Sequence, residues 1–99
     1  MMGAENKIKK LEGSWAFLKK HNERNALFLV SSVSLMAVGQ AVAKDQKDFV
    51  VELIKDGRLR RPTPEELEMW DSDGEWRDYL FPFVIVQPFV FVEYDIEDH

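Results

Sequence analysis

The stretch Phe83-Val84-Ile85-Val86-Gln87-Pro88-Phe89-Val90-Phe91-Val92 is the most apolar and most strand-like part of this chain. Branched and aromatic side chains favour extended backbone because they pack well across neighbouring strands. Both faces of the stretch are apolar, so it is either covered on two sides or exposes a patch that binds a partner. The candidate interface residues are therefore Phe83, Ile85, Pro88, Phe89 and Phe91.

Pro88 decides how this stretch is expected to run. Proline cannot donate a ladder hydrogen bond, so it is tolerated at a sheet edge or a bulge. A two-residue hairpin at Gln87-Pro88 is disfavoured, because type I′ and II′ turns need positive φ values that proline cannot adopt. The sequence predicts one bent strand over residues 83–93, with two short strands as the alternative. Alternation along one strand places Phe83, Ile85, Phe89 and Phe91 on the same face.

The first segment of the chain predicts a helix over residues 5–21. Its apolar residues recur at steps of three and four, which gathers them on one helical face: Ile8, Leu11, Trp15 and Leu18. The apolar run 26–30 that follows is too short for a helix and is bounded by polar residues. It predicts a buried strand that pairs with the C-terminal strand.

Two helices are expected in the middle of the chain. Ser32 or Ser34 can cap a helix over residues 35–44. Asp45 can cap the next helix in the same way, and Gly57 is expected to end it in the left-handed conformation.

The segment Thr63-Pro64-Glu65-Glu66 is the clearest local signal in the chain. It combines a capping threonine, a proline at the first helical position and a glutamate that can reach back to the cap. A fourth helix is therefore expected from this point. Together these patterns predict an α+β fold, with about four helices packed on a small antiparallel sheet formed by strands near 26–30 and 83–93.

The size and composition of the chain limit its function. Its 99 residues, 45% of them hydrophobic, predict a single domain over 1–99 with frayed ends at about 1–4 and 95–99. The 13 Lys and Arg are outnumbered by 18 Asp and Glu, and the formal charge of −5 repels nucleic-acid phosphates and anionic membranes at long range. Cysteine is absent, which excludes thiolate chemistry and fits a cytoplasmic setting.

The uncharged segment 26–43 follows several basic residues and has the composition of a weak membrane anchor. Its serines, its glycine and its length at the lower limit for a span favour a short strand followed by a buried helix. We therefore expect no membrane association.

The segment 35–61 suggests a rival function, because it resembles the helix-turn-helix and wing of excisionase-type DNA-binding proteins. In that hypothesis Arg58, Arg60 and Arg61 contact phosphates or another anion. The second helix carries charges of both signs and the chain is acidic overall, so nucleic-acid binding is disfavoured. Pairing of the arginines with acidic loops, or a contact with a protein or a small anion, explains them better than DNA binding does.

Catalytic signals are weak. The two histidines, His21 and His99, lie at a helix end and at the terminus, so no histidine triad, metal cluster or cofactor motif is indicated. A small-molecule or enzymatic pocket near Trp15, Trp70 and Trp76 is a further alternative, although tryptophans more often lie in a core or an interface.

Several motifs carry a resemblance to a known family. They are Trp15 with Leu18, Ala41-Val42-Ala43-Lys44-Asp45, Gly57-Arg58-Leu59-Arg60-Arg61-Pro62-Thr63 with Glu65-Glu66, and Val84-Ile85-Val86-Gln87-Pro88-Phe89-Val90. In these the chain resembles a bacterial family known as domain of unknown function 2288. The resemblance implies a small soluble domain and brings no activity, ligand or catalytic residue.

The expected function is therefore association, as a homodimer or an adaptor for another protein, through the C-terminal strand. The observation behind it is an apolar strand with two apolar faces and few other strands to cover them. DNA binding and a pocket near the tryptophans are the alternatives.

Overall fold

The computed structural model describes residues 8–72, 74–76 and 78–94, so the predicted frayed ends at 1–4 and 95–99 lie outside the described residues. Its four α-helices are α1 (Trp15–Glu23), α2 (Leu35–Ala43), α3 (Lys47–Lys55) and α4 (Pro64–Ser72), followed by a short 3₁₀ helix, Gly74–Trp76. Its five strands are β1 (Leu11–Gly13), β2 (Leu27–Val30), β3 (Leu59–Arg60), β4 (Phe81–Val86) and β5 (Phe89–Glu93).

The strands form one mixed sheet in the order β1-β4-β5-β2-β3. Strand β2 pairs with β5 in parallel, and the other neighbours are antiparallel. The α+β class with four helices is confirmed, and β2 does pair with the C-terminal segment. The prediction of a small antiparallel sheet was wrong, because β1 and β3 are too short to show a sequence pattern and because β2 runs parallel to β5.

The C-terminal segment is a hairpin, and the prediction of one bent strand was wrong. Strands β4 and β5 pair antiparallel, with Val86 opposite Phe89 across the turn. The Gln87–Pro88 peptide bond is cis. A turn with a cis proline at its third position, type VI, needs no positive φ at that proline. The objection to type I′ and II′ turns at Gln87-Pro88 therefore does not apply to this hairpin.

The hairpin also changes which residues share a face of the sheet. Ile85 lies opposite Val90 and Phe83 opposite Val92, while Val84 lies opposite Phe91. Residues directly opposite each other in a ladder point to the same face. Phe83 and Ile85 therefore share a face with two valines, and the prediction that they share it with Phe89 and Phe91 was wrong.

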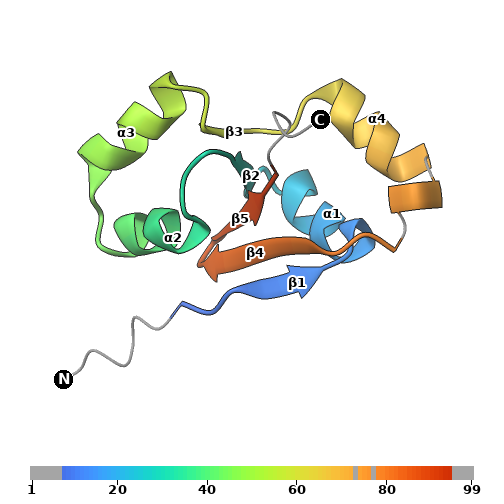
Figure 1. Ribbon diagram of the computed structural model, residues 1–99, viewed down its shortest axis with the longest axis horizontal. Coiled ribbons are helices and arrows are strands. Elements are labelled where there is room, and N and C mark those ends of the chain that lie inside the picture. Colours follow the sequence, from blue (N-terminus) through green and yellow to red (C-terminus); the bar gives the residue numbers. More distant parts are fainter. Residues whose placement is uncertain (1–7, 73, 77, 95–99) are drawn as a thin grey trace.

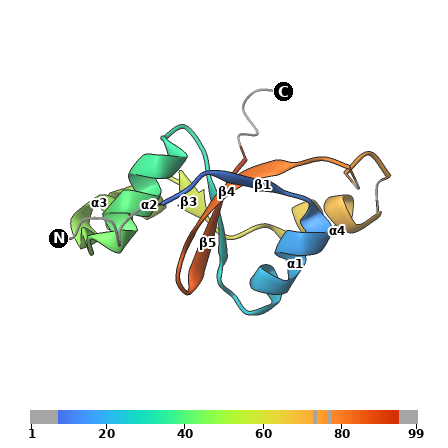
Figure 2. The same ribbon diagram turned by 90° about the horizontal axis from the view of Figure 1, so that it is seen from below.

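A pair of helices covers each face of the sheet (Figures 1 and 2). On one face, Trp15 and Leu18 of α1 and Trp70 of α4 pack with Phe81 and Phe83. The apolar residues of the other face pack against α2 and α3: Val30, Leu35, Val38, Leu53, Leu59, Val84 and Phe91. The hairpin strands are therefore central, and their two apolar faces are mostly covered inside the chain.

The N-terminal segment differs from the predicted helix over 5–21, whose first residues, 5–7, lie outside the described part. Residues Leu11–Gly13 are a strand paired with residues 81–83, and the helix runs only over Trp15–Glu23. Gly13 fits this strand pairing, because a Cβ there would lie 2.9 Å from Cε1 of Phe83. A glycine is needed where the two strands and a phenylalanine ring approach this closely.

The helix ends agree with most of the capping predictions. The Ser34 hydroxyl accepts a hydrogen bond from the Ala37 N–H at 3.3 Å, and Gly57 follows α3 with φ 77°. Thr63 and Glu66 form the reciprocal capping box at the start of α4. The Asp45 prediction was wrong: Asp45 has φ 59° in the turn after α2, and Gln46 is the N-cap of α3.

The uncharged segment 26–43 contains β2 and α2, as predicted. Within the described ranges, the helices are all too short or too polar to cross a membrane.

Candidate functional site

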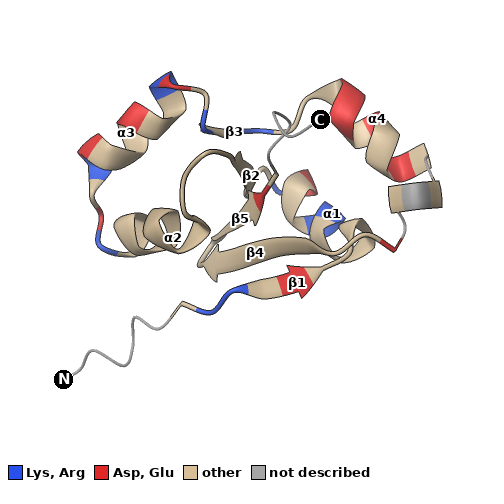
Figure 3. Cartoon of the chain, viewed as in Figure 1, with Lys and Arg blue, Asp and Glu red and all other residues tan. Residues whose placement is uncertain are grey.

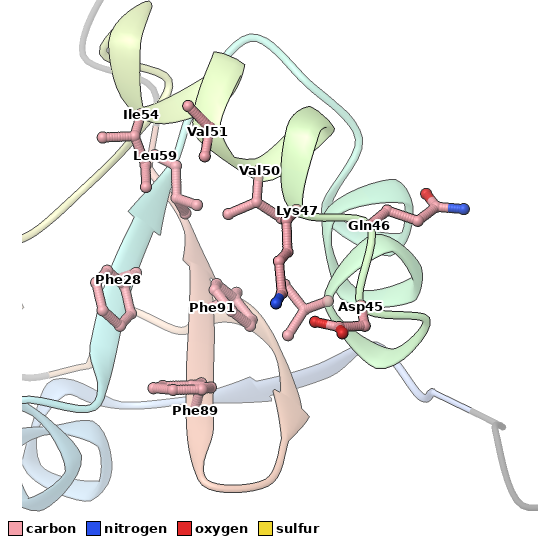
Figure 4. A pocket seen from close by; sticks show the side chains of 11 residues that line it. Phe28, Asp45, Gln46, Lys47, Val50, Val51, Ile54, Leu59, Phe89 and Phe91 are labelled. Atoms are coloured by element: carbon pink, nitrogen blue, oxygen red, sulfur yellow. The ribbon is translucent and has the colours of Figure 1, made fainter.

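An apolar groove of about 350 Å³ lies between α3 and the strands β2 and β5. Phe28, Phe91 and Leu59 form its floor, and Val50, Val51 and Ile54 of α3 form one wall (Figure 4). Phe89, beside the hairpin turn, lies at one end. Asp45 and Lys47 lie at the mouth, and the side chain of Gln46 beside them points away from the groove. We call this site the α3 groove.

The floor of the α3 groove is a cluster of phenylalanine rings. Phe28 and Phe91 stack with ring centroids 5.9 Å apart, and Phe89 meets Phe28 edge to face at 5.9 Å. The guanidinium carbon of Arg61 lies 5.6 Å from the Phe28 ring centroid. Ring packing and this cation–π contact hold the aromatic floor in place.

The rim of the groove is apolar and open to solvent. Val51, Ile54 and Phe89 are 45%, 56% and 37% exposed. An exposed helix position is ordinarily polar, since only the stripe facing the core needs to be apolar. Leu53 already supplies the buried contact of α3. The rim residues therefore contribute little to the core, and contiguous apolar surface of this kind marks interaction sites.

The structure separates the five predicted interface residues. Phe89 and Phe91 lie in the α3 groove, Phe89 at its rim and Phe91 buried in its floor. Phe83 is buried and Ile85 partly buried on the opposite face of the sheet, and Pro88 is exposed in the hairpin turn.

Phe28, Val51 and Ile54 line the groove but are not among the residues predicted from the sequence. The signal was present in α3, where residues 49–51 and 53–54 are all apolar. Five apolar residues spread over more than one side of a helix, so α3 has more apolar surface than one core contact needs.

The three predicted anion-binding arginines point to different places. Arg60 donates two hydrogen bonds to the Glu66 carboxylate, at 2.9 and 2.8 Å, and these bonds raise the pKa of its guanidinium. Burial favours a higher pKa for Glu66, but the hydrogen bonds from Arg60 and from the Thr63 N–H lower the pKa overall. This pair joins β3 to α4.

Arg61 is also engaged within the chain. Its guanidinium donates to the carbonyl oxygens of Leu27 and Asn22 at 3.0 and 3.3 Å and to Oδ1 of Asn25 at 3.2 Å. Arg58 lies on the surface, with Nε 3.9 Å from Oδ2 of Asp56. Anion binding by the three arginines stays a prediction, and two of the side chains would first have to leave their present partners.

The predicted tryptophan pocket corresponds to a smaller cavity of about 220 Å³ beside Trp15, Trp70 and Trp76. The Trp15 indole N–H donates to Oδ1 of Asp71 at 2.7 Å, and this hydrogen bond lowers the pKa of Asp71. Trp15 and Trp70 are buried, with ring centroids 5.0 Å apart. Their main contacts are with the core.

A family model described as "Protein of unknown function (DUF2288)" matches residues 5–94. The chain belongs to this family. The motifs that carried the resemblance are largely structural in this DUF2288 protein. Trp15 and Leu18 lie in the core, Gly57 ends α3, and Thr63 with Glu66 caps α4.

This DUF2288 chain is also similar to a solved structure, the NMR solution structure of PA1075 from Pseudomonas aeruginosa. The TM-score is 0.71 and the sequence identity 26%, and the similar region covers 86% of this chain and 76% of that chain. A search of curated proteins finds no match.

Proposed function

We propose that this protein functions through self-association, and that two copies form a homodimer through the α3 groove and its apolar rim. The observation that carries the proposal is that Val51, Ile54 and Phe89 surround an aromatic-floored groove while remaining open to solvent. Covering apolar surface is favourable by about 25 cal/mol per Å².

The strand pairing beside the groove favours a helical occupant over an added strand. Strand β5, which borders the groove, has a hydrogen-bonded neighbour on both sides, so its backbone is not available to a partner. The hairpin contributes side chains instead, with Phe89 at the rim and Phe91 in the floor. An amphipathic helix places residues three and four apart into such a groove.

DNA binding through residues 35–61 has less support. Arg60 and Arg61 already hold partners within the chain. Helix α3 carries both signs of charge along its length (Figure 3). Its exposed apolar residues, Phe49, Val51 and Ile54, offer no donors to base edges.

Sedimentation equilibrium over a wide concentration range tests the proposal. We expect wild-type protein to form dimers and Ile54→Asp to remain monomeric, since a carboxylate would be buried in an apolar contact. Leu80→Asp is the matched control, because Leu80 is 53% exposed against 56% for Ile54 and does not line the groove. Monomeric wild-type protein at every concentration would overturn the proposal.

A further inference from the structure

We propose that the two copies bind with their α3 helices antiparallel, each with its apolar side in the groove of the other, and with Asp48 beside Lys55 of the partner subunit. This arrangement rests on the proposed self-association. It specifies the occupant of the groove and the register in which the occupant lies.

The apolar side of α3 sets the line of contact. Lys47, Val51 and Ile54 are spaced by four and then three residues, which places them along one side of the helix. All three line the groove, Lys47 at the mouth and the other two along the wall (Figure 4). The apolar Val51 and Ile54 are exposed, so the α3 of a second copy offers apolar side chains that match the apolar lining of the groove.

The charges beside this line select the antiparallel orientation. Asp48 and Lys55 are seven residues apart, so they lie on the same flank of the Val51–Ile54 line, near opposite ends of α3. When two helices pack antiparallel, positions on the same flank face each other. With Val51 packed on Ile54 of the partner subunit, Asp48 lies opposite Lys55 of the partner subunit.

The two-fold symmetry of a homodimer repeats this contact. An isologous interface uses each pair twice, so it contains two Asp48–Lys55 ion pairs. Both side chains are exposed, and neither makes an ion pair with another residue in the described part of the chain. A parallel arrangement would not bring these two residues together.

The test uses Asp48→Lys and Lys55→Asp, separately and mixed. Each single variant replaces two attractive pairs by two repulsive ones, and we expect its dimer to dissociate about tenfold more readily than the wild-type dimer. When the Asp48→Lys and Lys55→Asp proteins are mixed, a dimer of one copy of each again contains two attractive pairs between positions 48 and 55. We therefore expect a heterodimer as stable as the wild-type dimer, seen by sedimentation or by native mass spectrometry.

Glu68→Lys is the control for charge alone, because Glu68 is exposed on α4 and does not line the α3 groove. Circular dichroism of each variant checks that the helix persists. If the wild-type protein dimerises and Ile54→Asp prevents it, but the single variants dimerise normally or their mixture gains nothing, the register is wrong and self-association stands. A monomeric wild-type protein overturns both proposals.

Discussion

The Arg60 guanidinium donates two hydrogen bonds to the Glu66 carboxylate, at 2.9 and 2.8 Å. Oε1 of the same carboxylate also accepts a hydrogen bond from the Thr63 N–H at 2.9 Å. These contacts connect the edge strand β3 to the first turn of α4. Glu66 is the one buried charged side chain among the described residues. Its charge is compensated on both sides, as a buried carboxylate requires.

Removing this carboxylate is expected to destabilise the fold. Glu66→Ala leaves the Thr63 N–H without its capping partner and Arg60 without its counter-ion, at a cost of about 2 kcal/mol in the free energy of unfolding. Urea denaturation measures this change. Glu65→Ala is the control, since Glu65 is exposed in the same turn and should shift stability by less than about 0.5 kcal/mol. Equal effects of the two substitutions would contradict the role of Glu66.

The same carboxylate predicts a pH dependence. The pKa of Glu66 is lowered from its ordinary value of 4.5 in the folded protein. A carboxyl with a lowered folded-state pKa stabilises the fold above its unfolded pKa, and this contribution is lost as the pH falls through the folded value. Wild-type stability should therefore fall more steeply below pH 4.5 than that of Glu66→Gln. Parallel curves from urea unfolding at pH 7 to pH 3 would rule this out.

A side chain at Gly13 is expected to destabilise the fold. A methyl group there would meet Cε1 of Phe83 at 2.9 Å and Cδ2 of Phe17 at 3.2 Å. Gly13→Ala should lower the free energy of unfolding by about 1–3 kcal/mol, the usual cost of overpacking. At Gly74 an added methyl meets nothing within 4 Å, so Gly74→Ala is the matched control. Thermal unfolding of both variants measures the difference in their stability. The prediction fails if Gly13→Ala is as stable as Gly74→Ala.

Arg61 and Arg58 should respond differently to substitution. Arg61→Ala removes hydrogen bonds to Leu27, Asn22 and Asn25 together with the contact on Phe28, and should destabilise by about 1–3 kcal/mol. Arg58→Ala removes only an exposed ion pair, with N and O 3.9 Å apart, and should change the free energy of unfolding by less than about 0.5 kcal/mol.

A DNA-binding titration of the same two variants at low salt tests the alternative function. Salt-sensitive binding that both substitutions weaken equally would instead favour the nucleic-acid hypothesis.

Much of the fold could be predicted from local patterns. The capping box at Thr63, the cap at Ser34 and the left-handed Gly57 depend on residues within one helical turn, and the structure has all three. The α+β class and the pairing of β2 with the C-terminal segment followed from apolar periodicity in the same way. The candidate site was predictable only in part, through Phe89 and Phe91.

The sequence by itself determined most of the helix caps, the fold class and the family, because capping, periodicity and motif spacing depend on residues close together in the chain. Only the tertiary structure decided that Gln87-Pro88 is a hairpin turn, that Gly13 belongs to a strand against Phe83, and that α3 leaves a groove beside Phe28 and Phe89. Each of these depends on strand register or on packing between segments far apart in the chain. A shift of one residue in register exchanges the two faces of a strand, and no local pattern reports that choice.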